Sequence, residues 1–312
     1  LMHSTGVAIA CLPVAAASVI GVSVPSTWTL IGLAASISIV GVPHGGLDHL
    51  TGRKLLADRL GSMWSLVFFP GYLVITSVVV VGWCTLPLAT AVIFFVLSAW
   101  HFGFEDDRSR FHSKLADSIC AIAIGGLVIW IPMLTQAEGV GSILQSIVPP
   151  GLSVLIPVII QTSQAMACVF VPVAALVIAR DAIRGNLSRA FRNTSFSLLF
   201  ALTDVLISFG IYFCGWHSIR GLARLAKDHG MSPLQLASAT APLSLGAIGL
   251  AGLGMWFWSS GQGVSEATSR TVFVALSAMA VPHLLLHGPI TEVVMKPACG
   301  GSESLEIVEA TS

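Results

Sequence analysis

Long apolar stretches separated by short polar ones dominate the pattern of hydrophobic and polar residues along this chain of 312 residues. A helix needs about 20 apolar residues to cross roughly 30 Å of hydrocarbon. The pattern therefore predicts an all-α fold, a polytopic bundle of about eight to ten transmembrane helices. The stretch from about 143 to 179 predicts either one long tilted helix or a broken pair. The other predicted spans cover about 5–24, 27–43, 64–84, 88–104, 115–134, 195–216, 240–259 and 271–290.

The composition supports a membrane environment. Hydrophobic residues make up 55% of the chain and charged residues 10%, whereas soluble domains average about 25% charged residues. Basic and acidic residues balance at 15 each, so no overall field favours a nucleic acid or an acidic partner. We expect a single transmembrane domain over residues 1–295 and a disordered polar tail over residues 296–312.

The positions of lysine and arginine predict the orientation of the bundle. The loops at 53–59 and 108–114 are basic, which indicates that both are cytoplasmic, with the N-terminus on the same side. A multi-pass protein of the inner (plasma) membrane is the expectation. Residues 180–192 and 220–227 are also basic, yet a single helix over 195–216 would place them on opposite faces, so one of the two would break the rule.

Four of the nine histidines lie within or at the edge of apolar runs: His44 in "VPHGG", His101 in "SAWHFGFED", His217 in "YFCGWHS" and His283 in "VPHLLLH". Polar groups at membrane depth are costly and usually functional, and a neutral imidazole is a good ligand for a transition metal. A lone histidine in a membrane helix more often makes a hydrogen bond between helices. Several in one compact bundle favour a shared metal site.

The segment around His44 predicts an interrupted helix. Pro43 and the glycines at 41, 45 and 46 disrupt helical hydrogen bonding, and irregular backbone at this depth is tolerated only where protein buries it or it lines a cavity. Asp48 lies four residues after His44, so it is expected either to orient that imidazole or to cap a helix at the membrane surface. The acidic residues at 105–107 are expected to form a solvated cytoplasmic cap.

Three stretches, "GVPHGGLDH", "SAWHFGFED" and "SFGIYFCGWHSIRGL", resemble in order and spacing the motifs of the Brp/Blh family of bacterial and archaeal β-carotene 15,15′-dioxygenases. The similarity runs from about residue 37 to about residue 290. Members of this family are multi-pass membrane proteins that use iron(II) and O₂ to cleave β-carotene centrally into two retinals, often beside genes for rhodopsins. The resemblance implies the same reaction and cofactor here, and a functional link to a retinal-binding rhodopsin.

The proposed iron ligands of the family are histidines, and the resemblance assigns this role to His44, His101 and His217. The last motif of the family usually reads WHSxRH, whereas Gly221 stands in this chain where the second histidine is expected. Because glycine cannot ligate a metal, either His283 or a water is expected to complete the set. Replacing Gly221 with histidine is then expected to raise iron occupancy or turnover, if the site is otherwise intact.

β-Carotene has no polar handle, so the resemblance also implies a long apolar tunnel reached from the bilayer. Two other functions stay open: Gly221 is compatible with a metal-free relative that binds carotenoid or retinal, and broken helices carrying His44 and Asp48 are typical of a small-molecule or ion transporter. Aromatic residues next to the proposed ligands are the candidate tunnel walls, namely Trp100, Phe102, Phe104, Phe213 and Trp216.

Overall fold

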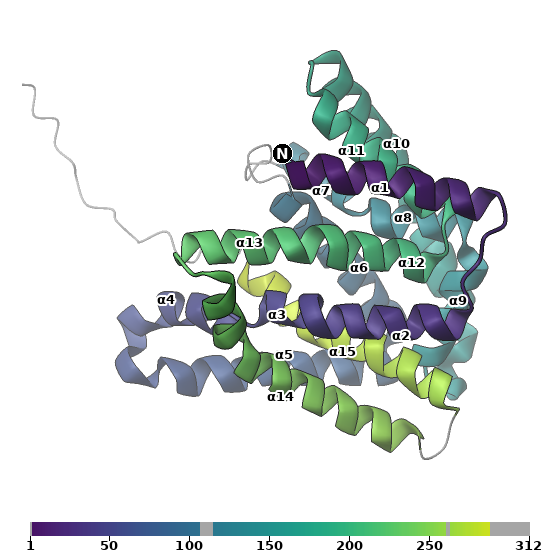
Figure 1. Ribbon diagram of the computed structural model, residues 1–312. Coiled ribbons are helices and arrows are strands. Elements are labelled where there is room, and N and C mark those ends of the chain that lie inside the picture. Colours follow the sequence, from purple (N-terminus) through teal and green to yellow (C-terminus); the bar gives the residue numbers. More distant parts are fainter. Residues whose placement is uncertain (1, 107–114, 260–262, 288–312) are drawn as a thin grey trace, which may run out of the picture.

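The computed structural model describes residues 2–106, 115–259 and 263–287, and every regular element in them is a helix (Figure 1). Five helical stretches are long and apolar enough to cross a membrane, and the bent pair α7–α8 makes a sixth if it counts as one span. The described part is therefore an all-α membrane bundle with fewer long spans than the eight to ten expected. The polar tail at 296–312 and the basic loop at 108–114 lie outside the described residues.

Short turns divide the chain into consecutive helical elements. Up to residue 135 these are α1 (Met2–Val19), α2 (Ser26–Ser36), η1 (Ile37–Gly41), α3 (Val42–Gly45), α4 (Asp48–Leu60), η2 (Gly61–Met63), α5 (Trp64–Thr85), α6 (Pro87–Asp106), α7 (Leu115–Gly125) and α8 (Leu127–Thr135). The elements that follow are α9 (Ala137–Ile147), η3 (Pro150–Leu155), α10 (Ile156–Ile183), α11 (Leu187–Leu202), α12 (Val205–Gly210), η4 (Ile211–Ser218), α13 (Ile219–Asp228), α14 (Pro233–Ser259) and α15 (Val264–Leu286).

The smaller number of long spans has two reasons. Residues 26–85 form one helical stretch that covers two of the expected spans, and several other apolar runs are split into shorter helices. The single helix expected over 195–216 is wrong, because Asp204 caps a new helix by accepting hydrogen bonds from the N–H groups of Leu206 and Ile207. The stretch from 143 to 179 is likewise broken into α9, η3 and α10. Two helical segments, rather than one, separate the basic stretches 180–192 and 220–227. The two basic stretches can therefore lie on the same side of the membrane.

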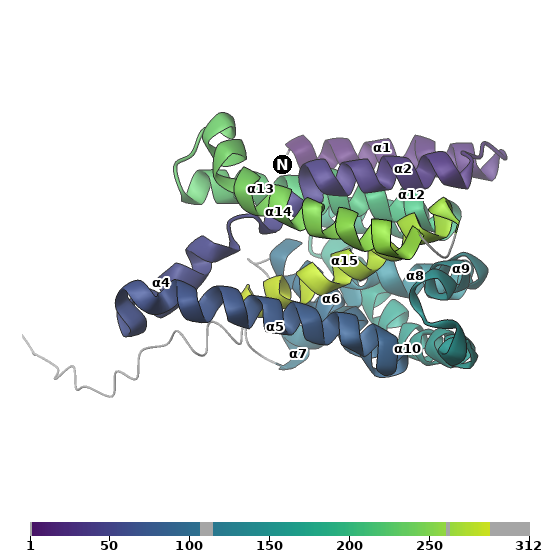
Figure 2. The ribbon, with the colours of Figure 1, turned by 90° about the horizontal axis from the view of Figure 1, so that it is seen from below.

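Helix α15 lies at the centre of the described bundle. It contacts α2, α4, α5, α6, α9 and α14 (Figures 1 and 2). Helices α8, α10 and α11 pack against one another beyond α6, and α1 covers α11. Aromatic side chains of α6, α11 and η4 fill the core between these layers, and Phe196, Phe200 and Trp216 are almost fully buried there. This packing fixes η4 beside α6.

Small residues allow α6 and α7 to approach closely. Ala99 on α6 and Ala121 on α7 are fully buried, and a Cβ added to Gly103 or to Gly125 would overlap backbone atoms of the facing helix. Small side chains at such contacts let helix backbones pack closely where lipid provides no hydrophobic drive for association. His101 belongs to the same stretch of α6, so this contact sets the position of its imidazole.

We predict that Gly125→Ala destabilises the protein by about 1–3 kcal/mol, because the added methyl group overpacks the α6–α7 contact. Thermal unfolding of the purified protein in detergent should show a lower Tm for this variant. Gly71→Ala on α5 is the matched control, since nothing lies within 4 Å of a Cβ at that position. Equal Tm values for the two variants would contradict the account of this contact.

Candidate metal centre

Four buried or largely buried imidazoles from four elements meet inside the bundle. His44 in α3, His101 in α6 and His217 in η4 are buried, and one ring nitrogen from each lies within 4.8 Å of the others. His283 of α15 joins them, with its ring centroid 5.0 Å from that of His44 and 5.2 Å from that of His101. We call these four residues the tetrahistidine cluster.

The cluster contains ring nitrogens that have no hydrogen-bond partner among the described residues. Both nitrogens of His44 and of His101 are buried and unpaired, and so is Nε2 of His283. Each buried polar group left unpaired costs about 1–3 kcal/mol, so a group of them in one place points to something that they bind. Neutral imidazole nitrogens are good ligands for divalent transition metals, so the donor set of this cluster fits such an ion.

A π-helical turn precedes His44. In η1 (Ile37–Gly41) the hydrogen bonds span five residues, as in the bond from Val42 N–H to the carbonyl of Ile37. Pro43 has no N–H to donate, and its ring crowds the carbonyl four residues earlier. A wider turn accommodates both effects. The interruption expected at Pro43 is therefore a local π-helix, a feature common at functional sites, and α3 ends two residues later.

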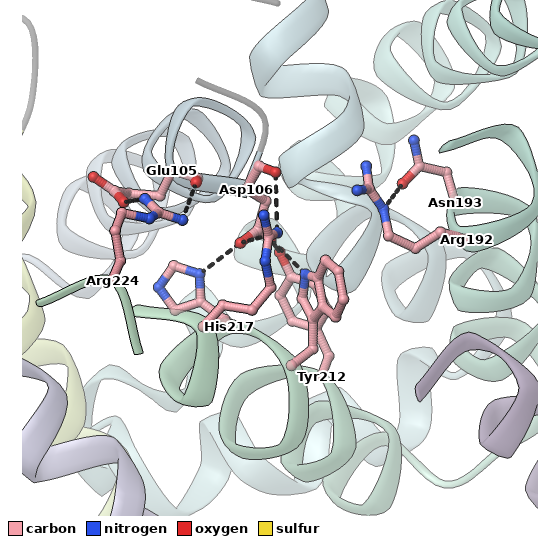
Figure 3. A network of polar contacts seen from close by, with 9 residues as sticks. Glu105, Asp106, Arg192, Asn193, Tyr212, His217 and Arg224 are labelled. Carbon is pink, nitrogen blue, oxygen red and sulfur yellow. Dashed lines mark hydrogen bonds and ion pairs between the residues drawn. The ribbon is translucent and has the colours of Figure 1, made fainter. Parts of the chain in front are cut away.

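His217 lies in a second π-helical segment, η4, whose wide turns bring residues five apart onto one face. An α-helix would separate such residues by about 140°. Tyr212 Oη donates to Asp106 Oδ2 at 2.7 Å, Trp216 Nε1 donates to the same oxygen at 3.1 Å, and Nδ1 of His217 lies 3.2 Å from Oδ1 (Figure 3). Asp106 thus orients the His217 ring and leaves its other nitrogen for the cluster.

Glu105 and Asp106 are not the solvated cap that the sequence indicated. Glu105 is buried and its carboxylate pairs with Arg224, while Arg220 NH1 lies 3.8 Å from Asp106 Oδ1. A carboxylate that orients a ligating histidine is a common feature of metal sites. Sequence spacing could not reveal this pair, because Asp106 and His217 lie 111 residues apart in the chain.

Asp48 contacts other imidazoles than the one expected. Its Oδ1 lies 2.8 Å from Nδ1 of His283 and 3.0 Å from Nε2 of His287. Its Oδ2 accepts a hydrogen bond of 3.0 Å from the hydroxyl of Tyr72. A turn separates α3 from α4, so Asp48 does not follow His44 along one helix face. The carboxylate orients His283, whose free Nε2 remains available to the cluster.

Gly221 provides the space that His44 occupies. A Cβ added at position 221 would overlap Cε1 and Nδ1 of the His44 ring. The His44 ring would have to shift to admit any larger residue. From this contact we predict that a histidine at position 221 would disturb His44, and His283 is the imidazole that lies beside His44 and His101.

An apolar cavity of about 730 Å³ reaches the cluster. All four imidazoles contribute to its wall, and the rest of the wall consists mainly of aliphatic and aromatic side chains. These side chains come from α5, α6, α8, α9, α12, α14 and α15. A ligand in this cavity would meet hydrocarbon almost everywhere except at the histidines.

Two of the five expected tunnel residues line this cavity. Phe102 and Phe213 are part of its wall. Trp100 instead packs against Phe104, with ring centroids 5.3 Å apart, and neither residue reaches the cavity. Trp216 is fully buried, and its ring contacts the guanidinium groups of Arg192 and Arg220, where it supports η4. We therefore place these last three aromatic residues in the packing around the site.

Known proteins resemble this chain over most of its length. The family described as "Beta-carotene 15,15'-dioxygenase" matches residues 35–289, a range that includes the whole tetrahistidine cluster. The chain is 24% identical to the "Probable beta-carotene 15,15'-dioxygenase Blh" of Halobacterium salinarum, over 89% of this chain and 88% of that protein. It is 27% identical to the "Beta-carotene 15,15'-dioxygenase" of an uncultured marine bacterium, over 81% of this chain and 90% of that protein. No solved structure is significantly similar.

We predict that Gly221→Ala weakens transition-metal binding by at least about tenfold, because its methyl group displaces the His44 ring. Titration with Co²⁺, followed through its visible absorption, measures this affinity directly. Gly215→Ala is the matched control, since it lies in the adjoining η4 and nothing surrounds an added Cβ there. Retention of the parental affinity by Gly221→Ala would refute the assigned role of Gly221.

Asp106→Asn should weaken Co²⁺ binding by about 10–100-fold, because the His217 ring loses the negative charge that orients it. The same titration measures the loss, and the absorption bands should shift as the ligand field changes. Asp58→Asn on the exposed side of α4 serves as the control. Identical spectra and affinities for both variants would contradict an orienting role for Asp106.

Proposed function

Since this chain belongs to the β-carotene 15,15′-dioxygenase family, we propose that it uses Fe²⁺ and O₂ to cleave the central 15,15′ double bond of β-carotene. The carbon–carbon double bond and the O–O bond both break. Each of the two retinal products receives one oxygen atom as an aldehyde, so the reaction balances without a further reductant. The observation that carries the proposal is a cluster of unpaired imidazoles in the wall of an apolar cavity.

In this proposal the tetrahistidine cluster holds the iron. Iron(II) supplies, when bound, the electrons that spin-restricted O₂ chemistry requires. Asp106 keeps His217 oriented and Asp48 keeps His283 oriented, each through Nδ1 of the ring. These contacts fix the tautomer in which the opposite nitrogen can bind a metal.

Aromatic side chains beside the cluster suit a polyene substrate. The ring of Phe102 lies edge-on to His217 at 4.7 Å, and the ring of Phe213 stacks on it at 6.1 Å. Both also line the cavity. They keep water away from this imidazole and offer flat apolar surface to a conjugated chain next to the cluster.

The apolar cavity and the membrane helices also support a reaction that takes place within the lipid bilayer. We propose that the protein works in the inner (plasma) membrane, where lipid dissolves β-carotene, and that a retinal-binding rhodopsin uses the product. Neither the metal-free binding of a carotenoid nor the transport of a small molecule requires unpaired imidazole nitrogens from α3, α6 and α15 to converge.

We predict that His101→Ala lowers retinal formation by at least about 100-fold, because one metal-binding nitrogen is lost, while the protein stays in the membrane. The measurement is retinal and residual β-carotene in cells that accumulate β-carotene and express each variant. His229→Ala, at the end of α13 and outside the cluster, should retain the parental yield.

The parent protein provides the decisive comparison. Unchanged pigment in cells that express it, together with a lack of iron in the purified protein, would refute the proposal. That result would favour a family member that binds carotenoid or retinal without a metal. Directional flux of a solute in proteoliposomes would favour a transporter instead.

A further inference from the structure

The cavity that reaches the tetrahistidine cluster has an exposed rim between α5 and α14. Both helices pack against α15, which is seen between them in Figure 2. Phe69 and Leu73 of α5 line the cavity, yet their exposed fractions are 38% and 57%. Leu243 and Leu250 of α14 line it from the other side and are 39% and 64% exposed. We call the part of the cavity between these four residues the α5–α14 groove.

Helix α14 packs against α3 and α15, and its buried residues lie in the first half of the helix. Thr240 and Ser244 are its buried residues, and both lie against Gly46, where an added Cβ would come within 2.8 Å of Thr240 Cβ and 3.2 Å of Ser244 Oγ. Beyond Ser244, no residue of α14 up to Ser259 is buried. The rest of α14 is only partly buried against α15, where the Trp258 ring lies 5.9 Å from the guanidinium group of Arg270.

The face of α14 that lines the cavity carries small residues at helical spacing. Its lining positions run from Pro242 to Trp258, a rise of about 24 Å along the helix. Gly246, Ala247 and Ala251 lie on this face, and a Cβ added to Gly246 would meet nothing within 4 Å. The wall of the groove thus extends along the axis of α14, which suits an extended ligand better than a compact one.

The groove belongs to the same cavity as the tetrahistidine cluster. The same cavity is lined by His44 and His283, whose unpaired nitrogens face the cluster. Helix α14 is long and apolar enough to span the membrane, and only 17% of the residues in its most apolar 18-residue segment are buried. The exposed rim of the groove therefore faces lipid. A polar ligand would find few partners along this path, whereas a long hydrocarbon would lose no hydrogen bonds on entering it.

We propose that the α5–α14 groove is the route by which a long apolar polyene passes from the bilayer to the cluster, and that part of the polyene lies along α14 during cleavage. This inference rests on the proposed function, because it takes β-carotene as the polyene. To that function the groove adds a path for the substrate, formed by α5, α14 and α15.

Gly246→Trp and Ala247→Trp test the groove by filling it. In lipid nanodiscs that contain β-carotene, both variants should lose at least about tenfold in kcat/KM for retinal formation, since the substrate cannot reach the iron. Their iron content and Tm should match those of the parent. Gly252→Trp is the control, because Gly252 is an exposed glycine with open space for a Cβ on the side of α14 away from the cavity.

A binding measurement keeps this test separate from catalysis. In a His101→Ala background, where no substrate is consumed, the β-carotene that copurifies per protein should fall with Gly246→Trp or Ala247→Trp and stay unchanged with Gly252→Trp. That pattern would support the groove even if the parent formed no retinal, which would refute the proposed function alone. Parental binding and turnover in both groove variants would overturn the inference. Equal losses of kcat/KM in the groove variants and in Gly252→Trp would also overturn the inference. So would the finding that a phospholipid chain occupies the groove while retinal formation stays at the parental rate.

Discussion

Burial of imidazole nitrogens without protein partners is the constraint on which the rest of this structure depends. A histidine in a membrane bundle can be satisfied by one hydrogen bond to a neighbouring helix, yet His44 and His101 have none among the described residues. His217 and His283, which each contact a carboxylate through Nδ1, lie beside these two rings. A bound cation is the simplest group that satisfies several imidazole nitrogens at one point.

Two different physical devices hold the four rings. Carboxylates orient two of them, Asp106 at His217 and Asp48 at His283. Close packing positions the other two. His44 rests on the bare backbone of Gly221, and His101 is carried by the stretch of α6 that packs tightly on α7. Helix α6 takes part in both, because it carries Asp106 as well as His101, whereas Asp48 and Gly221 lie on α4 and α13, so no single element determines the whole cluster.

The class of fold could be predicted from the sequence because apolar length alone reveals membrane helices. The residues that gather at the site could be predicted in part, since a histidine at membrane depth is costly enough to indicate a purpose. The hydrogen-bond partners of these histidines could not be predicted from the sequence. Asp48 and His283 are 235 residues apart, and only packing brings them together. The predicted helix boundaries were wrong between 195 and 216, because hydropathy treats this apolar run as continuous. The cap at Asp204 divides it into two helices.

A buried histidine cluster beside an open cavity raises a difficulty, because an opening usually admits water. In a soluble enzyme a lid would have to close over such a site. The α5–α14 groove avoids this conflict because its rim consists of apolar side chains on helices suited to span a membrane. An opening toward lipid exchanges one hydrocarbon for another and brings no water to the histidines. The same property that makes α14 a poorly buried helix therefore keeps the cluster dry while its substrate enters.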